Sequence, residues 1–177
     1  YQWGRPADGH EITVWNGTTK TAGRGLANVT ATLAADANPS HANFITSSSD
    51  WLATQADPDR WATANQGPCP ANYHVPSLAD WNTADAEALG SQDGTNGGNT
   101  TGWDNNTEVY DSALKLPSSG YRNRPDGTLY TQGILGYYWS STVFGTNASY
   151  LYFNSTVAST YNVDRAYGFT VRCLKRL

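Results

Sequence analysis

Alternating apolar and polar positions in the C-terminal third of the chain predict β-strands that are buried on one face. In the segment SYLYFNS, Leu151 and Phe153 share one parity. The other parity holds Tyr150, Tyr152 and Asn154. Successive side chains of a strand point to opposite faces, so we expect the first pair in the core and the other three residues on an outer face.

Further strands are predicted on both sides of this segment. Residues 114–123 and 129–141 have the pattern of two strands that are joined by a turn at RPDGT. The last predicted strand covers residues 168–174, where alternation places Phe169 and Val171 inward. Short strands separated by polar turns favour a loop-rich chain over a mainly helical one.

One clear helix is predicted after Ser77, which is a favourable N-cap residue with Asp80 at the position of a capping box. Gly90 marks its end. Apolar residues recur at helical spacing at Leu78, Trp81, Ala84 and Ala88. We expect this helix to lie across the core.

Residues 1–67 are predicted to be irregular and rich in loops. Tryptophans are spread through this half, and each offers a large apolar face that needs a pocket. They are Trp3, Trp15, Trp51 and Trp61. We interpret them as anchors that fix long loops to the core, the alternative being a set of platforms on which sugars stack.

The Gly-, Asn- and Asp-rich segment 90–108 is predicted to be a solvated loop. Asp93, Asp104 and Glu108 could supply oxygen ligands to calcium, but their spacing does not match an EF-hand loop. The sequence leaves a structural calcium in this loop open. It predicts no other metal site and no cofactor.

Length and charge narrow the class of protein. The chain has 177 residues and a mass of 19.1 kDa, which favours one domain over residues 1–177. Its formal net charge is −4 and its basic residues are scattered, so we expect no nucleic-acid partner. No apolar run approaches the ~20 residues of a membrane span, so we expect no membrane insertion. The sequence has no signal peptide and no methionine, which favours a processed or trimmed piece.

Residues with catalytic potential do not form a known motif. His10, His41 and His74 have no partner pattern such as HExxH, and GxSxG and phosphate-binding glycine patterns are absent from the sequence. We therefore interpret the histidines as loop or packing residues and expect that the protein is not an enzyme.

The chain has two cysteines, Cys69 and Cys173. They could form one disulfide bond or remain two buried thiols, and the count alone does not decide between these. If they are bridged, the closed loop of roughly 100 residues would stabilise the fold by about 4–5 kcal/mol in the chain-entropy view.

Several longer segments occur in the order and near the spacing of a known protein family. They are YQWGRPADGHE, PCPANYHVPSLADW, LKLPSSGYRNRPDGTLY, GYYWSST and RAYGFTVRCLK. Through them the chain resembles the Fibrobacter succinogenes major paralogous domain family over almost all of residues 1–177. The resemblance implies an α+β, C-type lectin-like fold that is loop-rich, with short antiparallel strands and one or two helices.

Within that family, residues 139–169 resemble the variable region of proteins diversified by diversity-generating retroelements. Reverse transcription that is inaccurate at template adenines changes Asn codons there, and each position below holds a residue that such changes can produce. The resemblance places candidate ligand-binding positions at Phe144, Asn147, Ser149, Tyr150, Tyr152, Asn154, Ala158, Tyr161, Asn162, Val163, Asp164 and Tyr167. The family pattern keeps Arg165 constant, so we expect this arginine to make a salt bridge or carbonyl contacts and not to touch a ligand.

Tyrosine with small polar residues is the composition that antibody loops use for binding. We therefore expect a receptor-recognition protein that binds an unknown macromolecular ligand, such as a protein or cell-surface receptor, without chemistry. Such a protein would be displayed on a virion surface, or extracellularly on a cell surface.

Two other functions are compatible with the same fold. The first alternative is a carbohydrate-binding or adhesin module that is not diversified, although the strand region lacks the EPN, QPD and WND triplets of calcium-dependent lectins. The second is an enzyme similar to those that generate formylglycine. Those enzymes need a reactive cysteine arrangement that Cys69 and Cys173 do not reproduce.

Overall fold

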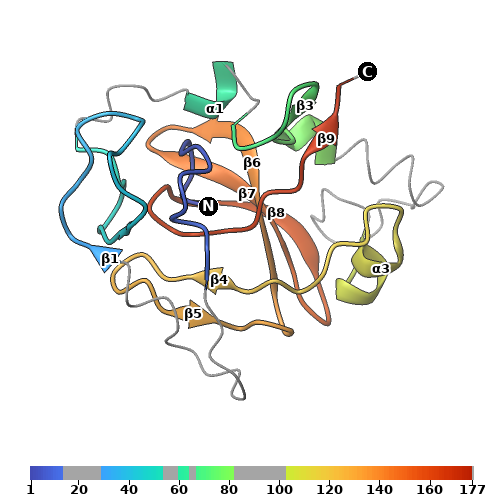
Figure 1. Cartoon of the computed structure of the whole chain (residues 1–177). Coiled ribbons are helices and arrows are strands. Elements are labelled where there is room, and N and C mark those ends of the chain that lie inside the picture. Colours follow the sequence, from blue (N-terminus) through green and yellow to red (C-terminus); the bar gives the residue numbers. More distant parts are fainter. Residues whose placement is uncertain (14–28, 54–59, 64–66, 82–102, 177) are drawn as a thin grey trace.

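The chain folds into a mixed α+β arrangement of short strands and short helices around a small antiparallel sheet (Figure 1). The computed structural model describes residues 1–13, 29–53, 60–63, 67–81 and 103–176. The predicted class of short antiparallel strands with few helices is confirmed for this part of the chain.

The central sheet has three antiparallel strands in the order β6-β7-β8. They are β6 (Gly136–Phe144), β7 (Asn147–Phe153) and β8 (Ala158–Asp164). Leu151 of β7 lies opposite Tyr138 of β6 and Thr160 of β8. The strand that alternation predicted around Leu151 is therefore β7.

Three further sheets, each of two short strands, hold the outer segments together. They are the parallel pair β1 (Val29–Thr30) and β2 (Phe44–Ile45), the antiparallel pair β3 (Tyr73–His74) and β9 (Leu174–Lys175), and the antiparallel pair β4 (Tyr121–Arg122) and β5 (Leu129–Tyr130). Among these pairs, β3 and β9 come from distant parts of the sequence, whereas β4 and β5 are joined by a short turn. The β3–β9 pair therefore brings the C-terminal segment back to the middle of the chain.

Both faces of the central sheet are covered by apolar side chains. Leu151 and Phe153 are fully buried on one face, as the alternation predicted. On the other face, Trp139 and Phe169 are buried in a second cluster, and Tyr150 packs against it. Tyr150 therefore lies opposite Leu151 as expected, but its face is not simply solvated.

The predicted strands at 114–123 and 129–141 are interrupted. Residues 129–141 divide into β5 and β6 because Thr131 and Gly133 turn the chain, with φ of 58° and 78°. Only β4 forms in the first segment, where Lys115 has a φ of 51°. Strands do not use this left-handed region, and alternation of side chains does not detect such turns.

The predicted strand at 168–174 is wrong in its extent. Gly168 forms single bridges to the N-terminal segment and to β4, and Thr170 forms one to β6. Only the last residue of the predicted range belongs to β9. The segment passes between three neighbours in turn, so no continuous ladder forms, although Phe169 is buried as predicted.

The predicted capping box is present at the start of helical residues 78–81. The backbone N–H of Asp80 donates to Ser77 Oγ over 3.1 Å, and the backbone N–H of Ser77 donates to the Asp80 carboxylate over 2.7 Å. Each side chain thus accepts a hydrogen bond from a backbone N–H that has no acceptor within the first turn of the helix. Ala84 and Ala88 lie outside the described residues.

Helix α3 (Asn106–Asp111) corrects the prediction of a solvated loop at 90–108 at its end, where residues 106–108 are helical, whereas residues 90–102 lie outside the described residues. Asn105 is its N-cap and accepts hydrogen bonds from two amides of the first turn. The Glu108 carboxylate accepts from the backbone N–H of Asp104 and from the Asn105 side chain. Sequence reasoning missed this short helix because it buries too few apolar residues for a helical period. A further short helix is α1 (Arg60–Thr63).

Tryptophans anchor the N-terminal loops, as predicted. The buried ones are Trp3, Trp51 and Trp61, and Trp15 lies outside the described residues. The guanidinium of Arg60 lies 4.8 Å from the centroid of the Trp51 ring and donates to the Asp50 carboxylate over 2.7 Å. Contacts between guanidinium groups and indole rings, together with a buried ion pair, thus fix these loops.

Arg165 has the structural role that was expected of it. Its side chain is buried, and its Nη2 donates to the Gly145 carbonyl over 3.0 Å. Its Nη1 lies 3.9 Å from the Asp50 carboxylate, and its guanidinium lies 4.5 Å from the centroid of the Trp3 ring. Arg165 therefore ties the end of β8 to the β6–β7 turn and to the N-terminal loops.

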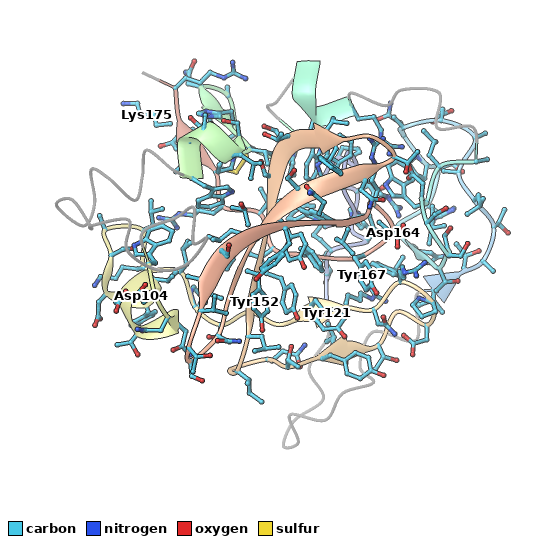
Figure 2. All side chains as sticks on the ribbon, turned by 180° about the vertical axis from the view of Figure 1, so that it is seen from behind. Asp104, Tyr121, Tyr152, Asp164, Tyr167 and Lys175 are labelled. Atoms are coloured by element: carbon cyan, nitrogen blue, oxygen red, sulfur yellow. A yellow bond between two sulfur atoms is a disulfide. The ribbon has the colours of Figure 1, made fainter. Side chains whose placement is uncertain are left out.

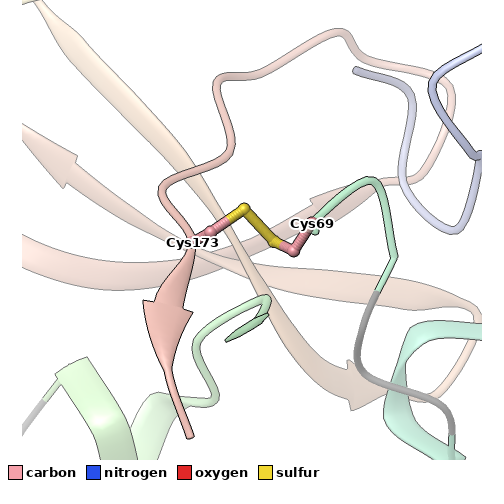
Figure 3. The surroundings of a disulfide bond; sticks show 2 residues. All are labelled: Cys69 and Cys173. Atoms are coloured by element: carbon pink, nitrogen blue, oxygen red, sulfur yellow. A yellow bond between two sulfur atoms is a disulfide. The ribbon is translucent and has the colours of Figure 1, made fainter. Parts of the chain in front are cut away.

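Cys69 and Cys173 form a disulfide bond (Figure 3). Their Cα atoms are 5.7 Å apart, although 104 positions separate them in the sequence. The bond joins the segment before β3 to the segment before β9. It therefore fastens the same two parts of the chain that the β3–β9 pair holds by hydrogen bonds.

Candidate functional site

Seven tyrosines form one connected aromatic surface, which we call the tyrosine surface. They are Tyr121, Tyr130, Tyr137, Tyr150, Tyr152, Tyr161 and Tyr167. Figure 2 shows three of them, Tyr121, Tyr152 and Tyr167, gathered on one side of the central sheet. The residues come from β4 to β8 and from the segment that follows β8.

The register of the central sheet brings four of these rings together. Tyr137 lies opposite Tyr152, and Tyr150 lies opposite Tyr161, with ring centroids 5.2 Å and 6.1 Å apart. Tyr137 and Tyr150 stack diagonally across the strands at 5.9 Å. Opposite and diagonal neighbours are within reach of aromatic side chains, so strand pairing alone builds this part of the surface.

Tyr121 connects a second sheet to the first. It lies opposite Tyr130 in the β4–β5 pair, where the two rings stack at 5.6 Å. It also contacts Tyr137 at 4.9 Å and Tyr167 at 5.9 Å. Two sheets and the chain after β8 therefore contribute to one surface.

Phe169 forms the floor of the tyrosine surface and is 3% exposed. The centroid of its ring lies 4.3 Å from Trp139, 4.9 Å from Tyr150, 5.0 Å from Tyr137 and 5.7 Å from Tyr167. Such offset and tilted ring pairs add stability beyond the area they bury. The tyrosines are thus held from below by a packed core.

The tyrosines differ in how far they reach into solvent. Tyr161 and Tyr130 are 46% and 38% exposed, and the other five are half-buried. Burial raises the pKa of Tyr150 to about 12, and burial followed by neighbouring tyrosines raises the pKa of Tyr137 as well. These two phenols are therefore neutral at physiological pH and can both donate and accept hydrogen bonds.

An ion pair borders the surface at Tyr167. Arg124 Nη2 lies 3.5 Å from an Asp164 carboxylate oxygen, and the Arg124 guanidinium lies 5.4 Å from the centroid of the Tyr167 ring. Both charged side chains are partly exposed. Their charges cancel, so the border adds polarity without giving the surface a net charge.

Six of the twelve predicted ligand-binding positions lie on or beside the tyrosine surface. They are Tyr150, Tyr152, Tyr161, Val163, Asp164 and Tyr167. Val163 is half-buried against the same cluster that holds Tyr150. This part of the predicted set is continuous in space.

The other predicted positions lie elsewhere. Ser149 and Ala158 are buried on the opposite face of the sheet, with exposed fractions of 1% and 0%. Asn162 is exposed on that opposite face and accepts a hydrogen bond from the Ser149 hydroxyl over 2.7 Å. The remaining positions, which lie at strand ends, are Phe144, Asn147 and Asn154. The side chain of Phe144 is 62% exposed. A template-derived set does not follow strand parity, so it covers both faces.

Sequence reasoning missed four residues of this site. Tyr121, Tyr130 and Tyr137 lie outside the variable region, and Arg124 lies in the turn between β4 and β5. The only available signal was the presence of three tyrosines in segments predicted to be strands. Their meeting with β7 depends on how two separate sheets pack, which alternation does not reveal.

A second cluster of ionisable residues, Asp8, His10 and Glu11, has the donor types of a metal site. However, His10 Nε2 accepts the backbone N–H of Gln2 over 2.9 Å, which leaves the proton on Nδ1, 2.6 Å from an Asp8 oxygen. Burial lowers the pKa of His10 to about 3, so the ring is neutral. Both ring nitrogens of His10 therefore have protein partners. This agrees with the prediction that His10 is a packing residue.

The calcium ligands considered at 90–108 are only partly described. Asp93 lies outside the described residues, and Glu108 is occupied at the start of α3. The described residues therefore give no support to a calcium site there.

Part of the chain matches a known family of protein domains. Residues 99–174 match the family described as Domain of unknown function (DUF8237), and this range contains all seven tyrosines of the tyrosine surface. No curated protein and no solved structure matches the chain. Among the described helices, none has the length and apolar character needed to cross a bilayer.

Proposed function

We propose that the protein is a recognition domain that binds a macromolecular ligand, and that the tyrosine surface is its binding face. The observation that carries this proposal is the continuity of seven tyrosine rings, drawn from two sheets and supported by one buried phenylalanine. A domain that only needed to cover its core would not require so many phenol groups at one solvent border. Large aromatic patches of this kind mark interaction sites.

The packing of the rings favours binding on energetic grounds. A tyrosine gives a large contact area and fixes few torsions when it binds. Tyr150 and Tyr137 are already held by Phe169, so little further ordering is needed on association. Tyr161 and Tyr130, the more exposed rings, would then make the most direct contacts with the ligand.

Protein is the class of ligand that this face suits best. Arg124 and Asp164 neutralise one another, so the face has no basic footprint for phosphates. Tyrosine-rich centres with a polar border are characteristic of protein interfaces. The reaction chemistry of an enzyme is not part of this proposal.

The finer identification is a C-type lectin-like variable protein of a diversity-generating retroelement. It is supported by the order of the segments that resemble the Fibrobacter succinogenes major paralogous domain family. It is also supported by Arg165, whose buried contacts fit a constant position, and by the exposure of Phe144, Tyr161 and Asn162 within residues 139–169. Exposed positions tolerate variation because they contribute little to the core.

Display outside the cell is part of the same proposal. The Cys69–Cys173 bond supports it, because disulfide bonds persist in oxidising surroundings and are rare in the cytosol. A virion surface and a cell surface are both compatible with such a bond.

The test of the retroelement proposal is the DNA beside the coding sequence. We expect a near-copy of the codons for residues 139–169 that differs chiefly at adenines, next to a reverse transcriptase gene. Substitutions should concentrate at codons 144, 161, 162 and 167 and spare the codon for Arg165. A neighbourhood without such a repeat would remove the retroelement proposal and leave a binding domain with a fixed surface.

A further inference from the structure

Within the part of the chain that the structure describes, β8 is an outer strand of the central sheet. The opposite edge, β6, is covered by the chain after β8. The backbone N–H of Trp139 donates to the Thr170 carbonyl over 2.9 Å, and the N–H of Thr170 donates to the Tyr137 carbonyl over 3.1 Å. A segment from another molecule that extended this sheet would therefore have to join it at β8.

The same hydrogen bonds fix which backbone groups of β8 point outward. The Tyr137 carbonyl points away from β7, so its partner in the register, Tyr152, directs its backbone groups toward β8 and Ser159. Backbone groups alternate between the two sides of a strand, and β8 pairs with β7 without a register shift. The backbone N–H groups of Asn162 and Asp164 therefore point away from the sheet, as does the Asn162 carbonyl.

The edge of β8 is open around Asn162. Ala158 and Thr160 each have a further partner, and the Asp164 carbonyl accepts from the N–H of Tyr167 over 3.3 Å. In contrast, no described residue bonds to the backbone N–H or C=O of Asn162, or to the N–H of Asp164. Asn162 is also exposed. The opening is therefore short, with two donors and one acceptor of the kind that another strand pairs with.

This opening lies beside the most exposed ring of the tyrosine surface. Tyr161 directly precedes Asn162 and is 46% exposed. Its ring contacts Tyr150 at 6.1 Å and Tyr152 at 5.9 Å, both of which belong to β7 on the inner side of β8. No other ring of the described residues contacts it. Side chains of adjacent strands pair on one face of a sheet, so an added strand would supply the missing neighbour of Tyr161.

β8 lacks the features that usually keep a strand edge from pairing. Natural edges are blunted by lysine, by proline or by a bulge. β8 contains no lysine, no proline and no register shift, and its one charged side chain, Asp164, is paired with Arg124. Water can solvate such an edge. However, an unprotected edge next to an exposed tyrosine is a ready site for a strand from a partner.

We propose that the protein ligand of the tyrosine surface contributes an extended segment that adds to the central sheet beside β8. In an antiparallel arrangement, one residue of this segment exchanges two hydrogen bonds with the N–H and C=O of Asn162. The N–H of Asp164 donates to a second carbonyl of the segment, and a neighbouring side chain lies against Tyr161. This mode of binding rests on the proposed function, and it narrows the ligand to a protein with an accessible extended segment.

The probe for this mode of binding is a short linear peptide that is selected on the folded protein from a displayed library. We expect saturation with this peptide to slow amide hydrogen exchange at Asn162 and Asp164 at least tenfold. Methylation of the peptide's backbone nitrogens, one at a time, should weaken binding at least tenfold at the residue that faces Asn162. Its two neighbours are the control, because their N–H groups point away from β8. Equal effects at all three positions, unchanged exchange at Asn162, or failure to select a binding peptide would overturn strand addition.

A pair of proline variants tests the same pairing from the side of the protein. N162P removes an outward N–H that takes no part in the β7–β8 pairing, so we expect it to fold and to bind the selected peptide at least tenfold more weakly. S155P places proline in the exposed β7–β8 turn, where no described residue accepts the N–H of Ser155, and it should bind like the parent. If N162P does not fold, the methylated peptides decide, because they leave the protein unchanged.

Further outcomes separate strand addition from the proposed function. Peptide binding that is lost in Y161A but kept in N162P would overturn strand addition and leave the tyrosine surface as the binding face. Binding that is unchanged in Y152A, Y161A and N162P alike would contradict both. A dimer of the protein that N162P abolishes would assign the edge to a second copy of this chain, and would overturn its assignment to the ligand.

Discussion

Tyr137 and Tyr150 stack across β6 and β7, with their ring centroids 5.9 Å apart and their planes 20° apart. Tyr137 precedes the predicted variable region, whereas Tyr150 is one of its candidate positions. A ring from the constant part of the chain is therefore in contact with a ring expected to vary. The tyrosine surface is therefore continuous with the buried cluster of Trp139 and Phe169, because both rings also contact Phe169.

This contact predicts that the exposed and the half-buried tyrosines respond differently to truncation. Y150A removes a ring that packs on Tyr137, Trp139 and Phe169, so we expect a loss of about 2–3 kcal/mol in the free energy of unfolding. Y161A removes a ring that is 46% exposed and should lose less than about 1 kcal/mol. Urea unfolding of both variants measures the difference, and equal losses would contradict this division of the surface.

Alkaline pH should destabilise the fold through the buried phenols. The pKa values of Tyr150 and Tyr138 are each raised by burial to about 12, from about 10 in the unfolded chain. The folded state then holds more protons than the unfolded state, so stability is complete below about pH 10 and falls as the pH rises toward 12. The Y138F/Y150F variant should lose less stability over this range in urea unfolding. An identical pH dependence of the variant and the parent would argue against buried phenols as the cause.

The parts of the structure that follow from local pattern were predictable from the sequence. The parity of Leu151 and Phe153 fixes their burial whatever β7 pairs with, and Ser77 with Asp80 forms a capping box within four residues. The positions of the turns were harder to predict from the sequence. Thr131 adopts a positive φ that its residue type disfavours, so Gly133 was the one residue of the two whose type is compatible with the break between β5 and β6.

The site was predictable only in part, because its members meet through register and sheet packing. Tyr150 and Tyr152 followed from alternation along one strand. Tyr121 was not identified, since its contact with Tyr137 requires the β4–β5 pair to lie against the central sheet. Ala158 was included among the candidate positions although it is buried in the core on the other face, because a list of codons that can vary carries no information on which side of β8 a residue lies.

Asp50 should be among the most sensitive polar positions of the fold. Its carboxylate accepts from Arg60 at 2.7 Å and lies 3.9 Å from Arg165, and all three side chains are buried. D50A would leave two buried guanidinium groups without their carboxylate, and breaking a buried ion pair from one side costs about 3–5 kcal/mol. Urea unfolding measures this loss.

A matched control for that variant lies on the surface. Asp111 is exposed at the end of α3, where a negative charge is slightly unfavourable for the helix. D111A should therefore change the free energy of unfolding by less than about 0.5 kcal/mol. If D50A were as mild as D111A, the arginines would be held by the tryptophans and carbonyls alone.

The disulfide bond should contribute a large share of the stability, because it closes a long loop. Cys69 and Cys173 are 104 positions apart, for which the chain-entropy relation gives about 4.7 kcal/mol. The C69S/C173S variant should therefore unfold at a much lower urea concentration than the oxidised protein. Reductant should lower the midpoint of the parent protein and leave that of the double variant unchanged. A parent whose midpoint does not respond to reductant, and whose two thiols react before any reduction, would show that the bond does not form in solution.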